Sequence, residues 1–242
     1  MASLESPVLP TPQWHQRQRP LNVLVEGNIG SGKSTVMRRM QELDSEIEIV
    51  GERIGDWENV NGYNLLEMFY ADKKRWAMSF QMCVYMSMMD AQAESYAAVD
   101  PGSRHARLME RSMYSAHKCF SRNLYLMNLM EPAQYAVLDR VMDWMEKECD
   151  TPPIDLIVYL KTPVNVCQER IRQRDRPAER DMTAEYLRNL EVLHDEWLLA
   201  STPTLSRWAS SCPPVVTVLN AEMDRVDAVA NEILALCKHC CQ

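Results

Sequence analysis

Short apolar runs alternate with longer stretches of mixed apolar and polar residues along the chain. The runs suit buried strands and cover residues 21–25, 46–50, 107–109, 156–160 and 215–219. Helix-compatible stretches lie at 34–43, 62–98, 112–149, 163–199 and 222–237. This alternation predicts an α/β fold with a five-stranded parallel sheet and helices on both faces. Ligands of such a sheet bind at the carboxyl ends of its strands.

The segment after the first run fits the phosphate-binding loop pattern G-x-x-x-x-G-K-[ST]. A strand, the glycine loop and a helix follow one another here, and this context disfavours the alternative of a chance glycine loop. Backbone N–H groups can hold a polyphosphate, Lys33 can reach its β- and γ-phosphates, and the Ser34 hydroxyl can ligate Mg²⁺. The predicted phosphate-binding residues are Gly27, Asn28, Ile29, Gly30, Ser31, Gly32, Lys33, Ser34 and Thr35.

Three charged residues follow predicted strands and are candidates for chemistry. Glu52 comes just past the second strand, where a carboxylate can accept the proton of an attacking hydroxyl. A solvated loop residue is the alternative for Glu52. Glu110 and Arg111 end the third strand, where phosphate-binding-loop proteins commonly place an acid that holds Mg²⁺, and a structural salt bridge is the alternative for both.

Residues 76–98 are apolar on nearly every side of the expected helix, which predicts that it is buried or packs against both a core and a partner. Most of its methionines are interpreted as core residues. Gln81 differs from them, because a buried amide needs partners and its paired donor and acceptor suit the edge of a nucleobase.

Four arginines, at 170, 172, 174 and 176, make a dense basic run in an otherwise acidic chain. Pro177 disfavours helix at the preceding residue, so the run straddles a helix end and a loop. We interpret it as a mobile lid that closes over a triphosphate, with a solvated charge run as the alternative.

Composition narrows the class of protein. The net charge of −8 argues against a general nucleic-acid binder, and no apolar run approaches the roughly 20 residues that span a bilayer. The first 20 residues hold four prolines and lack the apolar core of a secretory signal, and they match a mitochondrial transit peptide weakly. We therefore expect a cytosolic or nuclear protein with a disordered arm at 1–20.

The eight cysteines are scattered and are expected to be reduced, mostly buried thiols. Cys237, His239, Cys240 and Cys241 lack a second pair of ligands, so a dangling tail is favoured over a metal site. We expect a single domain at 21–237 and a flexible tail at 238–242.

The motifs together resemble the deoxyribonucleoside kinase family, on the branch that holds the insect multisubstrate deoxynucleoside kinase and thymidine kinase 2. The resemblance runs from about 21 to 220 and keeps the family's order of motifs. Its segments are residues 26–34, 57–62, 75–81, 109–112, 155–160, 169–174 and 193–197.

The resemblance implies a role for each matching position. Glu52 would take the proton of the 5′-hydroxyl, Arg111 and Lys33 would stabilise the transferring phosphate, and Glu110 would organise Mg²⁺ beside Ser34. The lid arginines Arg172, Arg174 and Arg176 would bind ATP. The implied substrate-binding residues are Glu52, Trp57, Tyr70, Phe80, Gln81, Val84, Met88, Arg111, Ala116, Phe120 and Glu179.

The implied activity is ATP- and Mg²⁺-dependent phosphorylation of deoxyribonucleosides in nucleotide salvage, by a homodimer. Small or apolar side chains at Met88 and Ala116 resemble the thymidine-accepting branch, so thymidine and deoxycytidine are expected as good substrates and purines as poorer ones. Arg53 stands where the family usually has proline, and His117 and Lys118 replace a common Arg-Tyr pair.

Two other functions are weighed against this one. A kinase of nucleoside monophosphates would need a cationic pocket for the acceptor's phosphate, whereas the Gln81 helix is apolar. A GTP-dependent switch would need the guanine-reading pattern Asn-Lys-x-Asp, which is absent from the sequence.

Overall fold

The computed structural model describes residues 19–97, 106–149, 153–176, 179, 182–199, 215–219 and 225–239. Five strands form one sheet in the order β2-β3-β1-β4-β5, and every neighbouring pair is parallel. This arrangement confirms the predicted α/β fold. The strands are β1 (Leu21–Glu26), β2 (Ile47–Val50), β3 (Ala106–Glu110), β4 (Leu156–Lys161) and β5 (Val215–Leu219).

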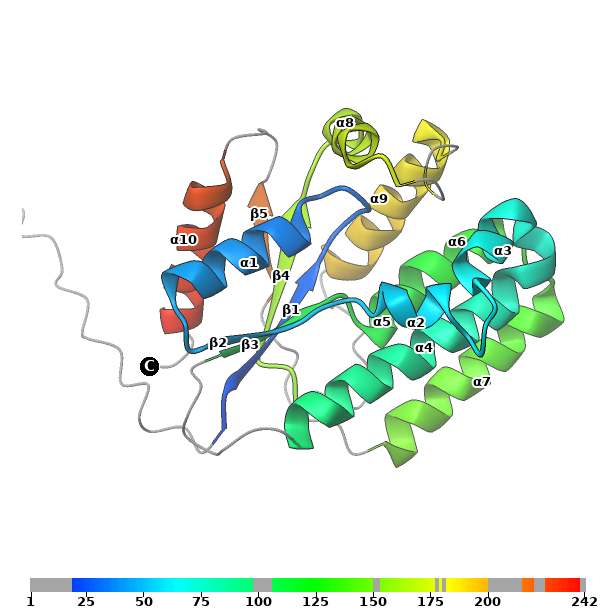
Figure 1. Cartoon of the computed structure of the whole chain (residues 1–242), viewed down its shortest axis with the longest axis horizontal. Coiled ribbons are helices and arrows are strands. Elements are labelled where there is room, and N and C mark those ends of the chain that lie inside the picture. Colours follow the sequence, from blue (N-terminus) through cyan, green and yellow to red (C-terminus); the bar gives the residue numbers. More distant parts are fainter. Residues whose placement is uncertain are drawn as a thin grey trace, which may run out of the picture.

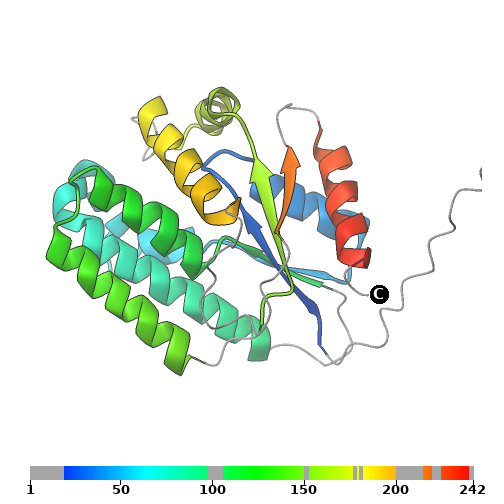
Figure 2. The same cartoon turned by 180° about the vertical axis from the view of Figure 1, so that it is seen from behind.

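Helices cover both faces of the sheet (Figures 1 and 2). On one face α1 and α10 pack on a core that includes Val36, Met40 and Ile233. A larger core lies on the opposite face, between the sheet and a layer that includes α4, α7 and α9. The helices are α1 (Lys33–Leu43), α2 (Ile54–Glu58), α3 (Leu65–Ala71), α4 (Lys73–Ala97), α5 (Met113–Ser115), the π-helix η2 (Ala116–Ser121), α6 (Arg122–Leu126), α7 (Pro132–Glu148), α8 (Val164–Arg174), α9 (Ala184–Leu198) and α10 (Val226–His239).

The register of the central strands brings the candidate residues to one edge. Val25 of β1 pairs with Glu110 of β3, and Glu26 pairs with Tyr159 of β4. All six residues of β1 are buried, because this central strand has a neighbour on each side and a core on each face. The phosphate-binding loop therefore leaves the sheet from a central strand that is buried along its whole length.

Three of the long helical stretches expected from the sequence are interrupted, so those predictions were too long. The stretch 62–98 divides into α3 and α4 at Asp72, whose backbone is not helical (φ −145°), and α8 ends at Asp175 in a left-handed conformation (φ 46°). The stretch 112–149 divides into α5, η2, α6 and α7, with Asn128 left-handed (φ 56°) before α7. One residue can end a helix without disturbing the apolar pattern around it, so periodicity did not locate these breaks.

The N-terminal end of the described chain is held to the domain. Arg19 donates from Nη1 to Oδ2 of Asp155 at 2.6 Å and from Nη2 to Oδ1 at 2.9 Å. Residues 1–18 of the expected disordered arm, and Cys240, Cys241 and Gln242 of the expected tail, lie outside the described residues, whereas Lys238 and His239 end α10.

Cys83, Cys119, Cys149 and Cys167 are free thiols, and Cys119, Cys167 and Cys237 are buried. No helix within the described ranges is long and apolar enough to cross a membrane. Within the same ranges, no group of three or more histidine, cysteine or acidic side chains could hold a metal ion by itself.

His194 makes the fold sensitive to acid. Its ring is fully buried in α9, stacks on Tyr159 with ring centroids 6.0 Å apart, and has Nδ1 2.7 Å from the carbonyl oxygen of Leu190. Burial lowers the pKa of His194 to about 3, against about 6.5 for an exposed histidine. The unfolded chain binds this proton more readily, so stability is lost as the pH falls from about 6.5 towards 3.

When the pH falls from about 6.5 to about 5, we therefore expect the free energy of unfolding of the wild type to drop by about 2 kcal/mol more than that of His194→Gln. This difference does not depend on how stable the variant is at neutral pH. Urea unfolding of both proteins at the two pH values measures this difference. Equal losses in the two proteins would contradict the assignment to His194.

Candidate active site

The phosphate-binding loop joins β1 to α1 and packs closely on β4 and α8. Gly27 has φ 148°, and a Cβ there would lie 2.7 Å from the carbonyl oxygen of Leu160. Gly30 has φ 75°, and a Cβ there would lie 2.6 Å from the carbonyl oxygen of Cys167. Both positions require glycine, because any side chain would push the loop away from the elements that shape it.

Lys33 is buried at the start of α1 and curls back over the loop. Its Nζ donates to the carbonyl oxygens of Gly27 at 3.2 Å and Asn28 at 2.9 Å. Burial, and then the charge of Arg111, lower the pKa of Lys33 to about 8. The ammonium group therefore lies among acceptors that only partly compensate its lost hydration, which favours an added anion.

The polar residues Asn28 and Ser31 of the loop stabilise its conformation and do not line the cavity. Asn28 donates from Nδ2 to the carbonyl oxygen of Leu187 at 2.8 Å, and its Oδ1 accepts from the backbone N–H of Ile29 at 2.8 Å. Ser31 is also buried, and its carbonyl oxygen accepts from Thr162 at 3.2 Å. Neither Asn28 nor Ser31 lines the cavity described below.

Ser34 and Glu110 meet at the mouth of the loop. The Ser34 hydroxyl donates to Oε1 of Glu110 at 2.8 Å. A hydroxyl and a carboxylate are hard oxygen ligands of the kind that Mg²⁺ takes, usually one or two from protein with phosphate oxygens and water completing the shell. The two side chains therefore fit a site for a divalent cation.

Glu52 and Arg111 form the central pair of the site. Oε1 of Glu52 lies 2.6 Å from Nε of Arg111, whose Nη1 donates to the carbonyl oxygen of Gly27 at 3.0 Å. Arg111 is buried, and the ring of Phe120 lies 4.5 Å from its guanidinium carbon. Burial alone would lower the pKa of Arg111, but the facing carboxylates, Glu52 foremost, raise it. The pair thus places a carboxylate and a permanent cation at one point.

Arg53 points away from this pair. Its guanidinium contacts Glu94 of α4 and lies 3.6 Å from Asp56 of α2. Arg53 is therefore neutralised by these two carboxylates, and its contact with Glu94 ties the segment between β2 and α2 to α4.

Glu26 is a buried acid that the sequence reasoning did not single out. It is fully buried at the end of β1, and its Oε1 accepts from the hydroxyl of Ser112 at 2.5 Å. Burial raises the pKa of Glu26 to about 7, against the opposing effect of the hydrogen bonds from Ser112 and Ser115. It does not line the cavity, so it supports the strand end from behind.

One cavity of about 650 Å³ contains most of the predicted site residues. One end of the cavity is formed by the phosphate-binding loop and the first turn of α1. Glu52, Glu110 and Arg111 lie between this phosphate end and the far end. The far end is mainly aromatic and aliphatic and is lined by Ile54, Trp57, Leu66, Phe69, Tyr70, Phe80, Gln81, Val84, Met88, Ala116, Phe120 and Tyr186.

Gln81 is the polar residue of that apolar end. It is 3% exposed, and its Oε1 accepts from the hydroxyl of Ser121 at 3.1 Å. Trp57 donates from Nε1 to the Ser87 hydroxyl at 2.8 Å and meets the ring of Phe80 edge-on at 5.7 Å. The pocket therefore offers one amide between fixed aromatic walls.

The lid residues reach the cavity unequally. Arg174 and Arg176 line it and both contact Glu179, Arg176 at 3.4 Å. Arg172 is turned outward to Glu169 and does not line the cavity. Arg170, which was not among the predicted ATP-binding residues, lines it and donates to the carbonyl oxygen of Ser31 at 3.0 Å.

Tyr70 lies between the lid and the apolar end. Burial raises the pKa of its hydroxyl, and the neighbouring Tyr186 and Glu179 raise it further. The sequence reasoning missed Phe69 and Tyr186, which line the same part of the cavity. Aromatic residues are ordinary core residues on their helices, so only the folded arrangement identifies them as pocket residues.

Comparison with known proteins agrees with this geometry. Residues 23–242 match the family described as Deoxynucleoside kinase. The chain is 34% identical over 217 residues to thymidine kinase 2, mitochondrial, of Macaca fascicularis, an alignment that covers 90% of this chain and 77% of the relative. The human protein of that name is 33% identical with the same coverage. Human deoxycytidine kinase is 31% identical over 197 residues, covering 74% of this chain and 76% of the relative.

The family match spans nearly the whole chain, and the parallel sheet and phosphate-binding loop agree with it. The protein therefore belongs to the deoxynucleoside kinase family, as its sequence motifs predicted.

Proposed function

We propose that this deoxynucleoside kinase transfers the γ-phosphoryl group of ATP to the 5′-hydroxyl of thymidine and deoxycytidine, and accepts purine deoxynucleosides less efficiently. The observation that carries the proposal is the cavity that joins the phosphate-binding loop to Gln81, with Glu52 and Arg111 between them. The relatives are a thymidine kinase and a deoxycytidine kinase, which favours the same two pyrimidines here.

The reaction depends mainly on positioning and charge. Glu52 is the proposed general base, because its carboxylate lines the cavity between the two ends and can take the proton of the 5′-hydroxyl. Arg111 would hold that hydroxyl and the developing negative charge, and Lys33 would neutralise the phosphates from the loop side. Both cations are already fixed by the protein, so little reorganisation accompanies transfer.

We further propose that Ser34 and Glu110 hold Mg²⁺, directly or through water. A divalent cation there supplies positive charge to the phosphate oxygens. Arg174 and Arg176 would bring further positive charge from the lid. Glu179, which contacts both arginines, would move with them towards the sugar 3′-hydroxyl beside Tyr70.

The apolar end suits a base and sugar better than a second phosphate. Of its described lining, Gln81 is the group that can pair with a base edge, while Trp57, Phe80 and Phe120 supply flat apolar walls. Val84, Met88 and Ala116 would bound the far side of the base, where the small Ala116 leaves room for a 5-methyl group. Among the residues described, the arginines and lysine that line the cavity lie on the loop, α1, the Arg111 turn and the lid, so a monophosphate acceptor is disfavoured.

ATP consumption measured in parallel with thymidine, deoxycytidine, deoxyadenosine, deoxyguanosine and thymidine monophosphate tests the proposal. We expect fast turnover of the two pyrimidines, slower turnover of the purines and none of the monophosphate, and we expect chelation to stop the reaction until Mg²⁺ is restored. Turnover of thymidine monophosphate alone would overturn the proposal.

Glu52→Gln should fold, bind thymidine with little change and lose about 10²–10⁴-fold in kcat, because the amide keeps the shape but cannot take the proton. Calorimetric titration with thymidine and steady-state kinetics measure the two effects. Glu67→Gln, an exposed substitution on α3, is the matched control and should keep the wild-type kcat. An unchanged kcat in Glu52→Gln would show that another group is the base.

We also propose that the chain forms a homodimer through neighbouring faces of α4 and α7. Met86 on α4 is 62% exposed, and Val137 and Trp144 on α7 are 46% and 59% exposed. These large apolar side chains are exposed on two helices that pack against each other, which makes the two helices candidates for an interface. A cytosolic or nuclear location remains part of the proposal.

Trp144→Glu should convert the dimer to a monomer, because a charge would be buried without a partner at the interface. Sedimentation velocity at micromolar concentration measures the change. Val192→Glu, which replaces a 53% exposed apolar residue on α9, is the control and should leave the dimer intact. A wild-type protein that sediments as a monomer would contradict the proposed interface.

A further inference from the structure

A continuous chain of hydrogen bonds leads from Gln81 to the protein surface. Oε1 of Gln81 lies 3.1 Å from the hydroxyl of Ser121, which lies 2.9 Å from the hydroxyl of Tyr85. That hydroxyl lies 2.8 Å from Nδ1 of His117, and Nε2 of His117 lies 2.9 Å from Oδ1 of Asp139. We call these five residues the relay. They come from α4, η2 and α7, and nothing in the proposed reaction uses four of them.

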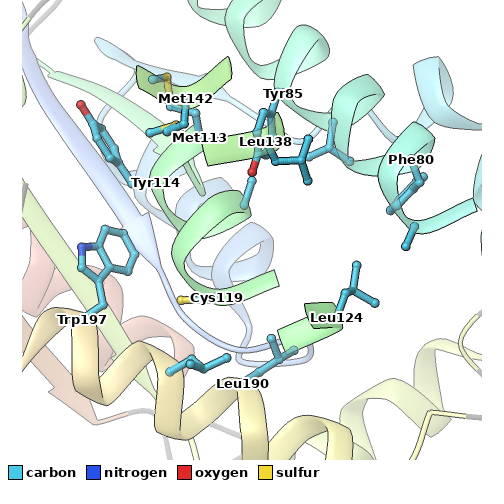
Figure 3. Packing of buried hydrophobic residues seen from close by; sticks show 14 of the residues in the cluster. Phe80, Tyr85, Met113, Tyr114, Cys119, Leu124, Leu138, Met142, Leu190 and Trp197 are labelled. Atoms are coloured by element: carbon cyan, nitrogen blue, oxygen red, sulfur yellow. The ribbon is translucent and has the colours of Figure 1, made fainter. Parts of the chain in front are cut away.

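The relay is buried over most of its length. Tyr85 and Ser121 are fully buried and His117 is 9% exposed, while the Asp139 side chain at the outer end is 52% exposed. Tyr85 packs between α4 and η2 among the residues of the larger core (Figure 3). The His117 ring is stacked on Tyr135 with centroids 5.6 Å apart and planes at 5°. These contacts fix the position of the His117 ring, whereas its protonation state can change.

Hydrogen counting restricts the relay to two states. A carboxylate only accepts, so Nε2 of His117 must carry a proton that it donates to Asp139. Each hydroxyl, on Tyr85 and on Ser121, has one hydrogen to give. The direction of the remaining bonds therefore depends on whether Nδ1 of His117 accepts or donates.

When His117 is neutral, its Nδ1 accepts from Tyr85, and Tyr85 accepts from Ser121. The Ser121 hydrogen is then used, so Ser121 must accept from the amide nitrogen of Gln81. When His117 carries a second proton, Nδ1 donates to Tyr85, Tyr85 donates to Ser121, and Ser121 donates to the amide oxygen of Gln81. In the structure Oε1 of Gln81 faces the Ser121 hydroxyl, which is the arrangement of the second state.

We propose that the relay makes His117 a positioning residue for base recognition, because its protonation decides which way round Gln81 presents its amide oxygen and nitrogen to the base. Ser121 and Tyr85 transmit that choice, and Asp139 fixes the tautomer. The inference rests on the proposed function, in which Gln81 pairs with the nucleobase.

The two pyrimidines need opposite orientations of the amide. Thymine presents an acceptor at O4 beside the donor N3–H, whereas cytosine presents a donor amino group at C4 beside the acceptor N3. An amide that pairs well with one base must turn by 180° to pair with the other. A relay that stabilises one orientation therefore favours one pyrimidine, and a change of its protonation shifts the preference towards the other.

Several groups decide where His117 changes state. Burial lowers the pKa of His117, and Lys118 of η2 lowers it further, while Asp139 and Asp143 of α7 oppose this. From α4 the facing group is the Tyr85 hydroxyl, and from α7 the Tyr135 ring covers the imidazole. The net direction is downward, so we expect the neutral state above about pH 6.5 and the charged state in more acidic solution.

Competition between thymidine and deoxycytidine in one reaction tests the relay, because the ratio of their kcat/KM values cancels any ionisation of Glu52 or of the phosphates. In the wild type we expect that ratio to change by about three- to tenfold between about pH 8 and about pH 5.5, as one hydrogen bond is exchanged for another. Nitrogen-detected NMR of the histidine rings, with His117→Asn to assign the signal, follows the protonation over the same range.

Tyr85→Phe keeps the ring and removes the hydroxyl link. Without that hydroxyl, Ser121 no longer donates to residue 85 and can donate to Gln81 at any pH. The ratio of the two kcat/KM values should therefore differ from that of the wild type at about pH 7.5 and should not change with pH. Tyr114→Phe, another buried tyrosine that is not part of the relay, is the matched control and should keep the wild-type ratio and its pH dependence.

Each outcome decides between the relay and the proposed function. A wild-type ratio that does not change with pH, together with the same ratio in Tyr85→Phe, would overturn the relay while both nucleosides are still phosphorylated. The same pH dependence in Tyr85→Phe as in the wild type would also overturn it. Failure of the wild type to phosphorylate either nucleoside would instead overturn the proposed function.

Discussion

The buried guanidinium of Arg111 joins the strand ends on which the candidate site is built. It pairs with Glu52 beyond β2 at 2.6 Å and donates to the carbonyl oxygen of Gly27 after β1 at 3.0 Å. Because a buried charge without partners is strongly unfavourable, the loop and the carboxylate are held to the position of this one side chain. Arg111 also has φ 64°, a conformation that costs a non-glycine residue about 1–3 kcal/mol and persists only when its surroundings impose it. Its backbone N–H, which donates to Val25 at 3.1 Å, is part of that restraint.

Two carboxylates near this point have different environments and therefore different uses. Glu26 lies behind the strand end, where burial raises its pKa to about 7 and Ser112 donates to it. Glu52 faces the cavity with its pair partner beside it. The acid with the raised pKa, Glu26, does not line the cavity, whereas Glu52 does, so geometry rather than titration identifies the candidate base.

The sheet, its parallel direction and the phosphate-binding loop were predictable because they depend on local patterns: short apolar runs, and glycines at fixed spacing before a helix. Glu52 and Arg111 could each be singled out from their places at strand ends, whereas their contact with each other was not predicted. The limits of the helices were not, because single residues such as Asp175 end them without changing the apolar pattern. The orientation of the lid arginines was not predictable either: Arg172 and Arg174 are two residues apart on one helix, and the first faces Glu169 on the outside while the second faces the cavity.

The acceptor pocket combines a fixed shape with one reversible polar edge. The Ser87 hydroxyl accepts from Trp57 at 2.8 Å and donates to the carbonyl oxygen of Val84 at 2.9 Å, so its single hydrogen is committed and the indole has one orientation. The Ser121 hydroxyl faces Gln81 and Tyr85, each able to give or take a hydrogen, so its direction is left to the groups behind it. Thymine and cytosine have nearly the same outline and differ in their hydrogen-bonding pattern at adjacent ring positions. Rigid aromatic walls therefore exclude neither base, and discrimination between them depends on the hydrogen-bond direction that reaches Gln81 from outside the cavity.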